Sequence, residues 1–397
     1  MRALEIVFWA SSAVVVYTYV LYPLALAALL RFRRPRPAPE AAPPRGPVSV
    51  ILAARNEEGT IGRRVRELAE MVAAPGPGGE VIVVSDGSTD RTAEAARLAA
   101  EDMGPRADAA VRVIEQPTNL GKAAALNAGY EAARSDFLVF ADARQRWAPD
   151  AIERLLENFA DPTVGAVSGD LVLEASPGVM AGVGLYWRFE KWLRKAESRV
   201  HSMASVTGSI SAVRRELYRP IPAGTILDDV YWPLRVAMQG YRLVHDERAV
   251  AFDRLPKRAR DETRRKVRTL CGIFQLLERL PSALLPWRNP VCWQLVSHRV
   301  LRLVVPWALL AALATSAFLG GAFYRAAFCL QVAFYVTGLA GAWRVAGSRS
   351  RLASAAASFL VLNTAAWLAF WVWVTGRASR SWSKVSYDAA PGRLSTP

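Results

Sequence analysis

Apolar residues are concentrated in two regions of this 397-residue chain. Residues 4–30 are apolar apart from Glu5 and a few small polar or aromatic side chains, and residues 303–376 contain three further apolar runs. A helix of roughly 20 apolar residues is long enough to cross the hydrocarbon core of a bilayer. We therefore predict a transmembrane helix at 4–30 and about three more within 303–376, with three to five as the range for the whole chain.

Between these regions, short β-branched runs alternate with stretches of helical pattern. The expected strands are Val48–Ala53, Val81–Ser85, Val111–Ile114 and Phe137–Ala141, and the expected helices are 60–73, 90–102 and 120–134. This alternation is typical of an α/β fold with a mostly parallel sheet, and we place that domain at 48–270. Ligands of such sheets bind beyond the carboxyl ends of the strands, so the polar residues that follow each strand are the candidates.

The segments that flank this domain differ from it in composition. Residues 31–47 are basic and then Pro-rich, which indicates a linker, and residues 377–397 form a polar tail. Residues 271–300 mix apolar, aromatic and basic side chains, as interfacial helices do. Four arginines lie between Arg31 and Arg36, directly after the first apolar run. Because such charge favours the cytoplasmic side, we expect an integral protein of the cytoplasmic (inner) membrane with a cytoplasmic central domain.

The overall charge narrows the set of partners. The chain has a formal net charge of +15 at pH 7 and a pI near 10.2, which would attract nucleic acid, anionic lipid or phosphorylated substrates. Its sequence has no zinc-binding spacing, helix-turn-helix pattern or Arg-rich RNA-binding pattern, so we expect no nucleic acid and instead membrane lipid and phosphate. The three cysteines form no disulfide framework, which fits a reducing cytosol.

Polar residues that suit a nucleotide follow three of the expected strands. Asn56 and Glu57 follow the first strand, Asp86 ends the second, and Asp142 ends the fourth. Lys122 opens the helix between the last two of these strands. Since the carboxyl ends of parallel strands meet at one edge of the sheet, these groups should converge on one crevice. Such a group of carboxylates and a lysine suits a nucleoside diphosphate, with the carboxylates for the nucleoside or a metal and the lysine for the phosphates.

Each of these groups has a chemical reason to contact a nucleotide. Asp86 can accept the imide N–H of a uracil or the ribose hydroxyls, and Gly87 lets the backbone turn sharply beside the base. Lys122 lies near a helix N-terminus, where free N–H groups also favour phosphate. Asp142 can hold ribose or a divalent metal that bridges the phosphates. A second interpretation stays open, in which residues 86–90 form only a turn and a helix cap.

Four segments together resemble a known enzyme family. They are Val48–Glu58, Val81–Thr92, Asn119–Asn127 and Phe137–Arg144. In this order and spacing they resemble the family 2 glycosyltransferases of GT-A fold, and most of all the membrane-bound branch of cellulose synthases and poly-N-acetylglucosamine synthases. The similarity covers residues 45–270. It implies a GT-A catalytic domain flanked by transmembrane helices, and inverting transfer from a UDP-sugar or similar nucleotide-sugar donor to a saccharide or lipid-linked acceptor.

The resemblance also assigns the acceptor side. Direct displacement at the anomeric carbon needs a base that deprotonates the acceptor hydroxyl. The family has a Thr-Glu-Asp type motif for this purpose, and Asp228-Asp229 stands in the corresponding place, with Asp229 as the candidate base and Asp228 beside it. Gly208 and Ser209 match the family's acceptor-binding segment. The alternative is that the two aspartates only cap a helix, where they would favour its dipole.

Two departures from the family pattern affect cofactor and product. The family's Asp-x-Asp motif reads Asp142-Ala143-Arg144 here, which puts a Mg²⁺ or Mn²⁺ requirement in doubt; either Asp142 holds the metal with the phosphates, or Arg144 neutralises part of the diphosphate charge. The processive Gln-x-x-Arg-Trp motif is reduced to a basic run in which Arg265 and Arg268 are the candidates for donor binding. That run could also face lipid headgroups, so processive polymerisation does not follow.

Three functions remain open at this point. The first is extension of a cell-surface polysaccharide or glycolipid at the cytoplasmic membrane face. The second is nonprocessive transfer of one sugar to a lipid carrier. The third is a catalytically inactive scaffold that binds nucleotide, which the change at Arg144 makes conceivable, although Asp86, Lys122 and Asp229 are all retained.

Fusion of a periplasmic phosphatase near Gly104 tests the predicted topology. We expect the phosphatase to be inactive, because the arginines after the first apolar run should hold residues 45–300 in the cytoplasm. A cytoplasmic reporter at the same position is the matched control and should be active. An active phosphatase at this position would contradict the assignment.

Overall fold

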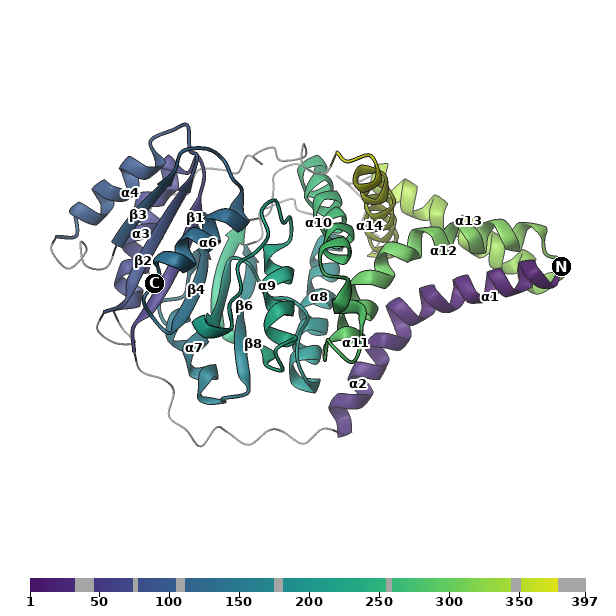
Figure 1. Cartoon of the computed structure of the whole chain (residues 1–397). Helices are drawn as coiled ribbons and strands as arrows, with labels where there is room; N and C mark the ends of the chain where they lie inside the picture. The colour runs from purple at the N-terminus through teal and green to yellow at the C-terminus, as the bar shows by residue number, and fades with distance from the viewer. Residues whose placement is uncertain are drawn as a thin grey trace.

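The computed structural model describes residues 1–32, 46–73, 78–104, 111–174, 181–254, 259–343 and 351–377. An α/β domain forms one half of the molecule, and long helices extend from it toward the N-terminus (Figure 1). The expected linker at 31–47 lies mostly outside the described residues, and of the expected tail at 377–397 only Arg377 is described.

The α/β domain is built on an eight-stranded sheet of order β3-β2-β1-β4-β7-β6-β8-β5. The strands are β1 Val48–Ala54, β2 Glu80–Asp86, β3 Val111–Gln116, β4 Phe137–Asp142, β5 Arg146–Trp147, β6 Val164–Glu174, β7 Ile210–Arg214 and β8 Arg242–Arg254. The pairs β1–β2, β2–β3, β1–β4 and β6–β8 are parallel, whereas β4–β7, β6–β7 and β5–β8 are antiparallel. The four expected strands are all present, and the sheet becomes mixed beyond β4.

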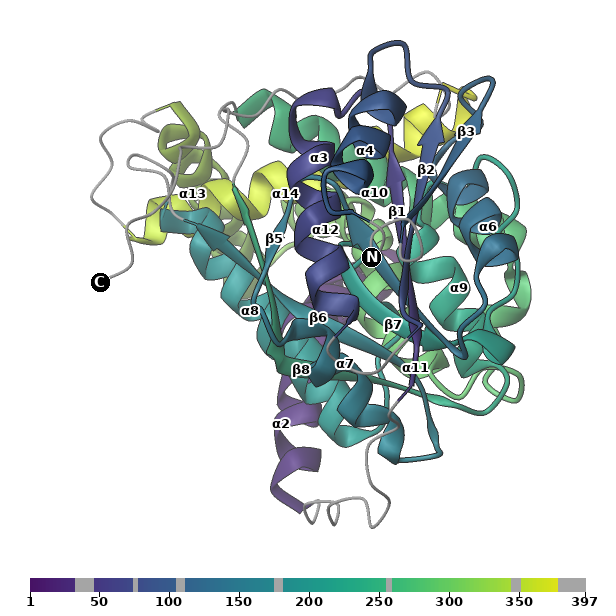
Figure 2. The ribbon, with the colours of Figure 1, turned by 90° about the vertical axis from the view of Figure 1, so that its left-hand side faces the viewer.

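Helices cover both faces of the sheet (Figure 2). Helices α3 (Glu58–Val72), α4 (Thr92–Glu101) and α7 (Ala151–Glu157) share one core with the strands, and α6 (Lys122–Ala132) and α9 (Asp228–Ala237) share the other. Strand β1 shows why two cores form: Val50 and Leu52 point into the first, and Ile51 into the second. A strand buried on both faces has a nearly continuous apolar sequence, which is the pattern of Val48–Ala53 apart from Ser49.

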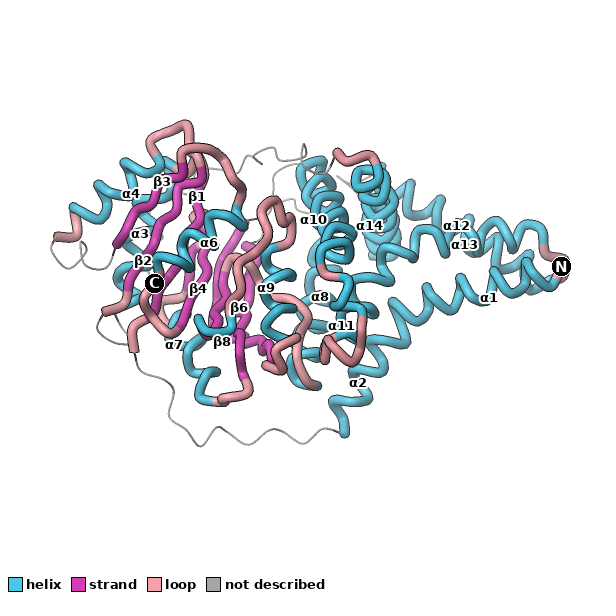
Figure 3. Tube along the Cα trace, viewed as in Figure 1, coloured by secondary structure: helices cyan, strands magenta, loops and turns pink. Residues whose placement is uncertain are grey.

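Four helical segments are long and apolar enough to cross a membrane: Arg2–Phe32, Cys292–Phe318, Ala322–Gly341 and Ala353–Val374. They comprise α1 (Arg2–Val16), η1 (Tyr17–Leu21) and α2 (Tyr22–Phe32); α11 (Cys292–Leu295), η5 (Val296–Val300) and α12 (Leu301–Phe318); α13 (Ala322–Trp343); and α14 (Arg351–Val374). Figure 3 shows the sheet on one side and this helical part on the other. The described residues thus hold four candidate spans, and the last three of them overlap residues 303–376, where the sequence predicts about three.

The segment expected to be interfacial, 271–300, divides between two elements. Its first part belongs to α10 (Ala259–Arg279), which runs between the sheet domain and α14 (Figure 1). Its last part, from Cys292, opens the helix that continues to Phe318, with a wider π-helical turn at Val296–Val300. That turn carries His298 and Arg299 into contact with the sheet domain.

A buried polar cluster joins the two halves of the molecule. His298 lies between two carboxylates of α8 (Ala181–Val200): its Nδ1 is 2.7 Å from Glu197 and its Nε2 is 3.0 Å from Glu190. Tyr22 of α2 donates to Glu197 at 2.6 Å, and Arg302 of α12 pairs with Glu190. Because buried charges are tolerated only when paired, these contacts hold α8 and the apolar helices in one arrangement.

Candidate active site

The polar loops beyond β1 and β2 are tied to each other. Asn56 has a left-handed backbone with φ of 54°, and its side-chain oxygen accepts the backbone N–H of Thr89 at 2.8 Å. The N–H of Asn56 in turn donates to Ser88 Oγ at 3.2 Å, and the N–H of Glu57 to Thr92 Oγ1 at 2.8 Å. Asn and Asp tolerate this backbone conformation better than most residues. Asn56 and Glu57 thus shape the strand-end loops in which the sequence places a nucleotide.

Asp86 is buried and organises the loop that leads into α6. Its two carboxylate oxygens accept the backbone N–H groups of Leu120 at 2.6 Å and Gly121 at 2.9 Å. The next residue, Gly87, has φ of +55°, and a Cβ there would lie 2.3 Å from the backbone nitrogen of Asn119. Only glycine allows the two loops to approach this closely. Asp86 therefore has a structural role in addition to the nucleotide contact predicted for it.

Lys122 joins two of the predicted carboxylates. Its Nζ is 2.8 Å from Asp142 Oδ1, at the end of β4, and 3.7 Å from Asp228 Oδ2, at the start of α9. Burial alone would lower the pKa of Lys122, but the attraction of Asp142 and Asp228 raises it above its usual value. The lysine is therefore charged, and it brings the donor side and the acceptor side of the predicted site together.

Asp229 differs from its neighbour Asp228, which pairs with Lys122, because its own carboxylate makes no ion pair or hydrogen bond to any of the described residues. Burial, reinforced by the negative charge of Asp228, raises the pKa of Asp229 to about 6, against the opposing effect of Lys122, Arg299 and Arg194. A carboxylate with a pKa near neutrality is a better proton acceptor than an ordinary aspartate, because it binds a proton more tightly while still being mostly ionised at pH 7. These are the properties that a general base requires.

Helix α10 closes the site on the side of the apolar helices. The N–H of Ile226 donates to Gln275 of α10 at 2.9 Å, and a Cβ at Gly272 would lie 2.6 Å from Leu227. This contact holds α10 against the residues that precede Asp228. Burial lowers the pKa of Arg268, which lies one turn before Gly272. The nearby carboxylates of Asp228 and Asp229 act against this shift. Arg265 is one turn further from this contact on the same helix.

Arg144 is held by a carboxylate that the sequence did not indicate. Its Nε and Nη2 donate to the two oxygens of Asp253 in β8, at 2.9 and 2.6 Å. Gln145 donates to the same carboxylate at 3.0 Å. A bidentate pair of this kind fixes the guanidinium in one orientation. Arg144 therefore balances the charge of Asp253. A diphosphate bound near Arg144 would share its positive charge with that carboxylate.

The two predicted acceptor residues lie beside the candidate base. A Cβ at Gly208 would lie 3.1 Å from Asp229 Cβ, so the glycine makes room for the aspartate. The carbonyl of Ser209 accepts the indole N–H of Trp147 at 3.2 Å. The backbone of Asp229 is bound to the same segment, because its carbonyl accepts the N–H of Val206 at 3.0 Å. These contacts bring Gly208 and Asp229 together, and Ser209 follows Gly208 in the chain.

A mixed α/β sheet with carboxylates and a lysine beyond its strand ends defines a catalytic domain of the type that the sequence resemblance implied. The profile described as Glycosyl transferase family group 2 matches residues 137–374, and that of Glycosyl transferase family 2 matches residues 49–221. The first match covers more than half of the chain. The chain therefore belongs to the family 2 glycosyltransferases, and it is an enzyme of that class.

One solved structure is similar over nearly the whole chain. It is a mannosyltransferase from Pyrobaculum calidifontis in complex with GDP-Man and Mn²⁺, with 25% sequence identity and a TM-score of 0.70. The alignment covers 94% of this chain and 99% of that one. This likeness, together with the sheet and the four apolar segments, confirms the prediction of a GT-A domain flanked by membrane-type helices.

Two relatives match shorter parts. The undecaprenyl-phosphate 4-deoxy-4-formamido-L-arabinose transferase of Pseudomonas paraeruginosa is 35% identical over 113 residues, or 28% of this chain and 32% of that protein. The poly-beta-1,6-N-acetyl-D-glucosamine synthase of Staphylococcus aureus is 23% identical over 238 residues, or 58% of this chain and 56% of that protein. The aligned parts thus span about a third and about half of these relatives.

Sequence reasoning missed three residues near the site: Asp253, Arg194 and Arg299. Asp253 is distant in sequence from Arg144, and nothing in the local pattern around either residue signals their pairing. Arg194 lies within an amphipathic helix rich in charge. Arg299 carried a usable signal, because it lies inside an apolar helical segment, where an ionisable residue is uncommon and often functional.

The rate of the reaction should depend on the ionisation of Asp229. A base acts when it is deprotonated, so we expect full activity above about pH 7 and a loss approaching tenfold per pH unit below about 6. Asp228→Asn removes the like charge that helps to raise this pKa, so it should move the midpoint to lower pH. The measurement is the pH dependence of kcat for both proteins. A rate that is constant from about pH 5 to 8, or a midpoint unmoved by the substitution, would contradict the assignment.

Proposed function

We propose that this protein is an inverting glycosyltransferase that moves a sugar from a nucleotide-sugar donor to a saccharide or lipid acceptor at the cytoplasmic membrane face. The observation that carries the proposal is Asp229: a carboxylate without a hydrogen-bond partner among the described residues, with a pKa of about 6, beside the charged pair of Asp228 and Lys122. A base in this state is what single displacement at an anomeric carbon requires.

The proposed reaction is one displacement. The acceptor hydroxyl attacks the anomeric carbon, its proton passes to Asp229, and the bond to the diphosphate breaks, so that the nucleoside diphosphate leaves. Lys122 and the N-terminus of α6 lie where positive charge stabilises a leaving diphosphate. Asp228 keeps Lys122 in position, and its own charge makes Asp229 more basic.

The donor is a nucleoside diphosphate sugar in this account. Support for this comes from the convergence of Asp142, Lys122 and the loops at Asn56 and Asp86, and from the bound GDP-Man of the similar mannosyltransferase. The sequence resemblance favours a UDP-linked donor, whereas the solved neighbour holds a guanine nucleotide. A panel of UDP-, GDP- and dTDP-sugars decides between them.

The residues present fit a divalent cation that is held largely by the substrate. Among the described residues no group of three His, Cys, Asp or Glu side chains converges as a metal site. Mg²⁺ often needs only one or two carboxylates together with substrate phosphates, and Asp142, about one-third exposed, can be one of them. A bound cation would neutralise charge on the leaving diphosphate. Lys122 is already in place for part of the same task.

The acceptor in this proposal is a lipid-linked sugar or a polysaccharide rather than a small soluble molecule. Both relatives act on such acceptors by name, and α10 and the apolar helices adjoin the site. The basic run on α10 keeps arginine without the Gln and Trp of processive synthases. Nonprocessive transfer to a lipid is therefore the second candidate within the same reaction.

The first prediction from this mechanism concerns Asp229→Asn. The amide has nearly the shape of the carboxylate but cannot accept the proton, so we expect transfer to fall by about 10²- to 10⁴-fold. Nucleotide affinity should change little, because the residue faces the acceptor side. Transfer assays and calorimetry with the same donor measure the two quantities. Transfer at the parent rate would contradict the role, and loss of nucleotide binding would mean that the substitution disturbs the donor site.

The second prediction concerns the metal. We expect chelation to reduce transfer only in part, because Lys122 supplies fixed positive charge beside Asp142. Arg144→Asp should increase the metal requirement, because it replaces a cation with a carboxylate next to Asp253. Transfer rates with and without chelator, for both proteins, provide the measurement. Complete loss of the parent activity with chelator would show that the cation is essential and that Lys122 does not substitute for it.

A further inference from the structure

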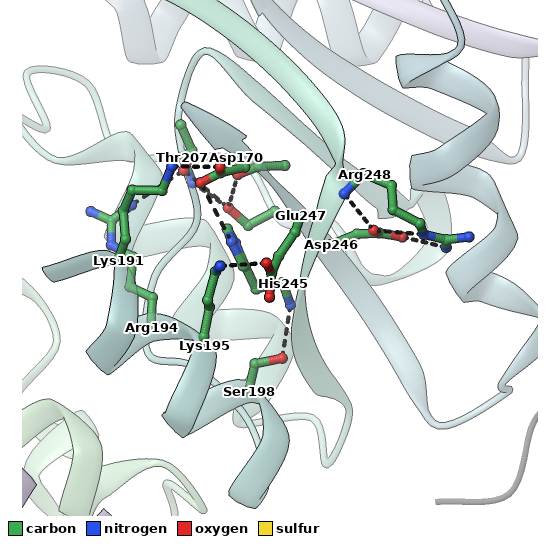
Figure 4. Close-up of polar contacts among 12 residues, drawn as sticks. Asp170, Lys191, Arg194, Lys195, Ser198, Thr207, His245, Asp246, Glu247 and Arg248 are labelled. Atoms are coloured by element: carbon green, nitrogen blue, oxygen red, sulfur yellow. Dashed lines mark hydrogen bonds and ion pairs between the residues drawn. The ribbon is translucent and has the colours of Figure 1, made fainter. Parts of the chain in front are cut away.

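Two arginines contact the four-residue segment that also positions the candidate base. Arg194 of α8 donates from Nη1 to Thr207 Oγ1 at 3.2 Å, a contact drawn in Figure 4. Arg299 of the π-helical turn donates from Nη2 to Ser205 Oγ at 2.6 Å. Between these two contacts, the N–H of Val206 donates to the carbonyl of Asp229, and Gly208 lies against the Asp229 side chain. The segment 205–208 therefore contacts both arginines and also Asp229.

These two arginines lower the pKa of Asp229, but no ion pair within the described part of the chain neutralises their charges. Arg194 and Arg299 form no ion pair with a carboxylate of the described residues, although both are half-buried. The Nε of Arg194 is fully buried and has no hydrogen-bond partner in that part of the chain. Their neighbours behave differently: Lys191 pairs with Asp170 at 2.5 Å, and Arg302 pairs with Glu190 (Figure 4 shows the former). The two guanidinium groups thus differ from these neighbours in carrying charge that no carboxylate of the described residues pairs with, which leaves them available to an anionic ligand.

The position of the pair indicates where that ligand comes from. Arg299 belongs to the helical segment Cys292–Phe318, which is apolar enough to cross a membrane. Arg194 belongs to α8, which packs against α2 and α14 of the apolar helices. His298, next to Arg299, is fixed between Glu190 and Glu197, so the backbone that carries Arg299 is held in place. The two guanidinium groups thus lie where the sheet domain meets the apolar helices.

From this geometry we propose that Arg194 and Arg299 bind the phosphate of a membrane lipid acceptor, next to the acceptor hydroxyl that Asp229 deprotonates. Guanidinium groups suit phosphate because they offer several N–H donors in a planar arrangement. This inference rests on the proposed transferase function. The acceptor phosphate takes no part in the chemistry: the acceptor hydroxyl oxygen bonds to the anomeric carbon, its proton goes to Asp229, and the donor diphosphate leaves.

The site is distinct from the donor diphosphate position. Lys122 faces Asp142 and Asp228, whereas Arg194 and Arg299 contact the segment 205–208, on the acceptor side of Asp229. The enzyme would therefore bind two phosphate-bearing substrates through different side chains near one base. Binding of the acceptor phosphate would place its hydroxyl at Asp229 and would favour lipids over soluble sugars.

The test measures binding of decyl phosphate, a lipid-phosphate probe, to the purified full chain in neutral detergent. We expect Arg194→Gln and Arg299→Gln each to weaken binding by about tenfold or more, since each removes charge-assisted hydrogen bonds to phosphate. Arg299→Lys should retain part of the affinity because it keeps the charge. The matched control is Arg199→Gln on the exposed face of the same helix, which should bind as the parent does. Decanol, without the phosphate, should bind far more weakly.

Donor affinity, measured by calorimetry in the same variants, separates the possible outcomes. Unchanged donor affinity with weakened decyl phosphate binding supports the proposal and shows that the variants are folded. Equal decyl phosphate affinity in the parent and both variants would overturn it, as would equal binding of decanol. Inorganic phosphate bound as tightly as decyl phosphate would assign the site to a free anion and overturn the lipid acceptor. Loss of donor affinity in Arg299→Lys as well as the Gln variants would assign the arginines to the donor.

The transfer assay separates failure of this inference from failure of the proposed function. If the parent transfers sugar and decyl phosphate does not compete with the lipid acceptor, the transferase function stands and the phosphate site is wrong. If the parent transfers sugar from none of the UDP-, GDP- or dTDP-sugars, the proposed function itself fails. Competition by decyl phosphate that is lost in Arg194→Gln supports both.

Discussion

The candidate site depends on one half-buried ammonium group, that of Lys122. Three carboxylates, Asp142, Asp228 and Asp229, come from two elements that are far apart in sequence, β4 and α9. Without a cation between them, their mutual repulsion would favour protonation or separation. Lys122 lies 2.8 Å from Asp142 and 3.7 Å from Asp228, so it stabilises the approach of these two elements. Asp229 follows Asp228 in the chain and is the carboxylate of the three whose pKa of about 6 suits proton exchange.

The position of Lys122 is itself determined by the loops beyond β2. Asp86 accepts two N–H groups from the residues that precede α6, and Gly87 allows those residues to approach. The start of α6, and with it the lysine, is therefore fixed relative to the sheet. On the other side, His298 between Glu190 and Glu197 fixes the apolar helices to α8. The candidate base lies between a rigid donor side and an acceptor side that adjoins the apolar helices.

The sequence predicted the parts of this arrangement that depend on local pattern. Strands β1 to β4 and the helices between them follow from apolar runs and their spacing, and the residues after each strand follow from the rule that ligands bind there. The reversed strand β7 could not be predicted, because its direction is set by pairing with β4 and β6. The Arg144–Asp253 pair was missed for the same reason, since it joins residues more than 100 positions apart. Asp86 was expected to contact nucleotide, whereas its backbone hydrogen bonds depend on a loop that only the folded chain brings close.

The central claim is that the chain transfers sugar by a single displacement assisted by Asp229. The most direct test is to supply the purified protein, in vesicles of its native lipids, with labelled nucleotide sugars and to determine the anomeric configuration of the product by NMR. The account predicts a lipid- or saccharide-linked product whose configuration is inverted relative to the donor. Retention of configuration, or nucleotide binding without transfer from any donor, would contradict it.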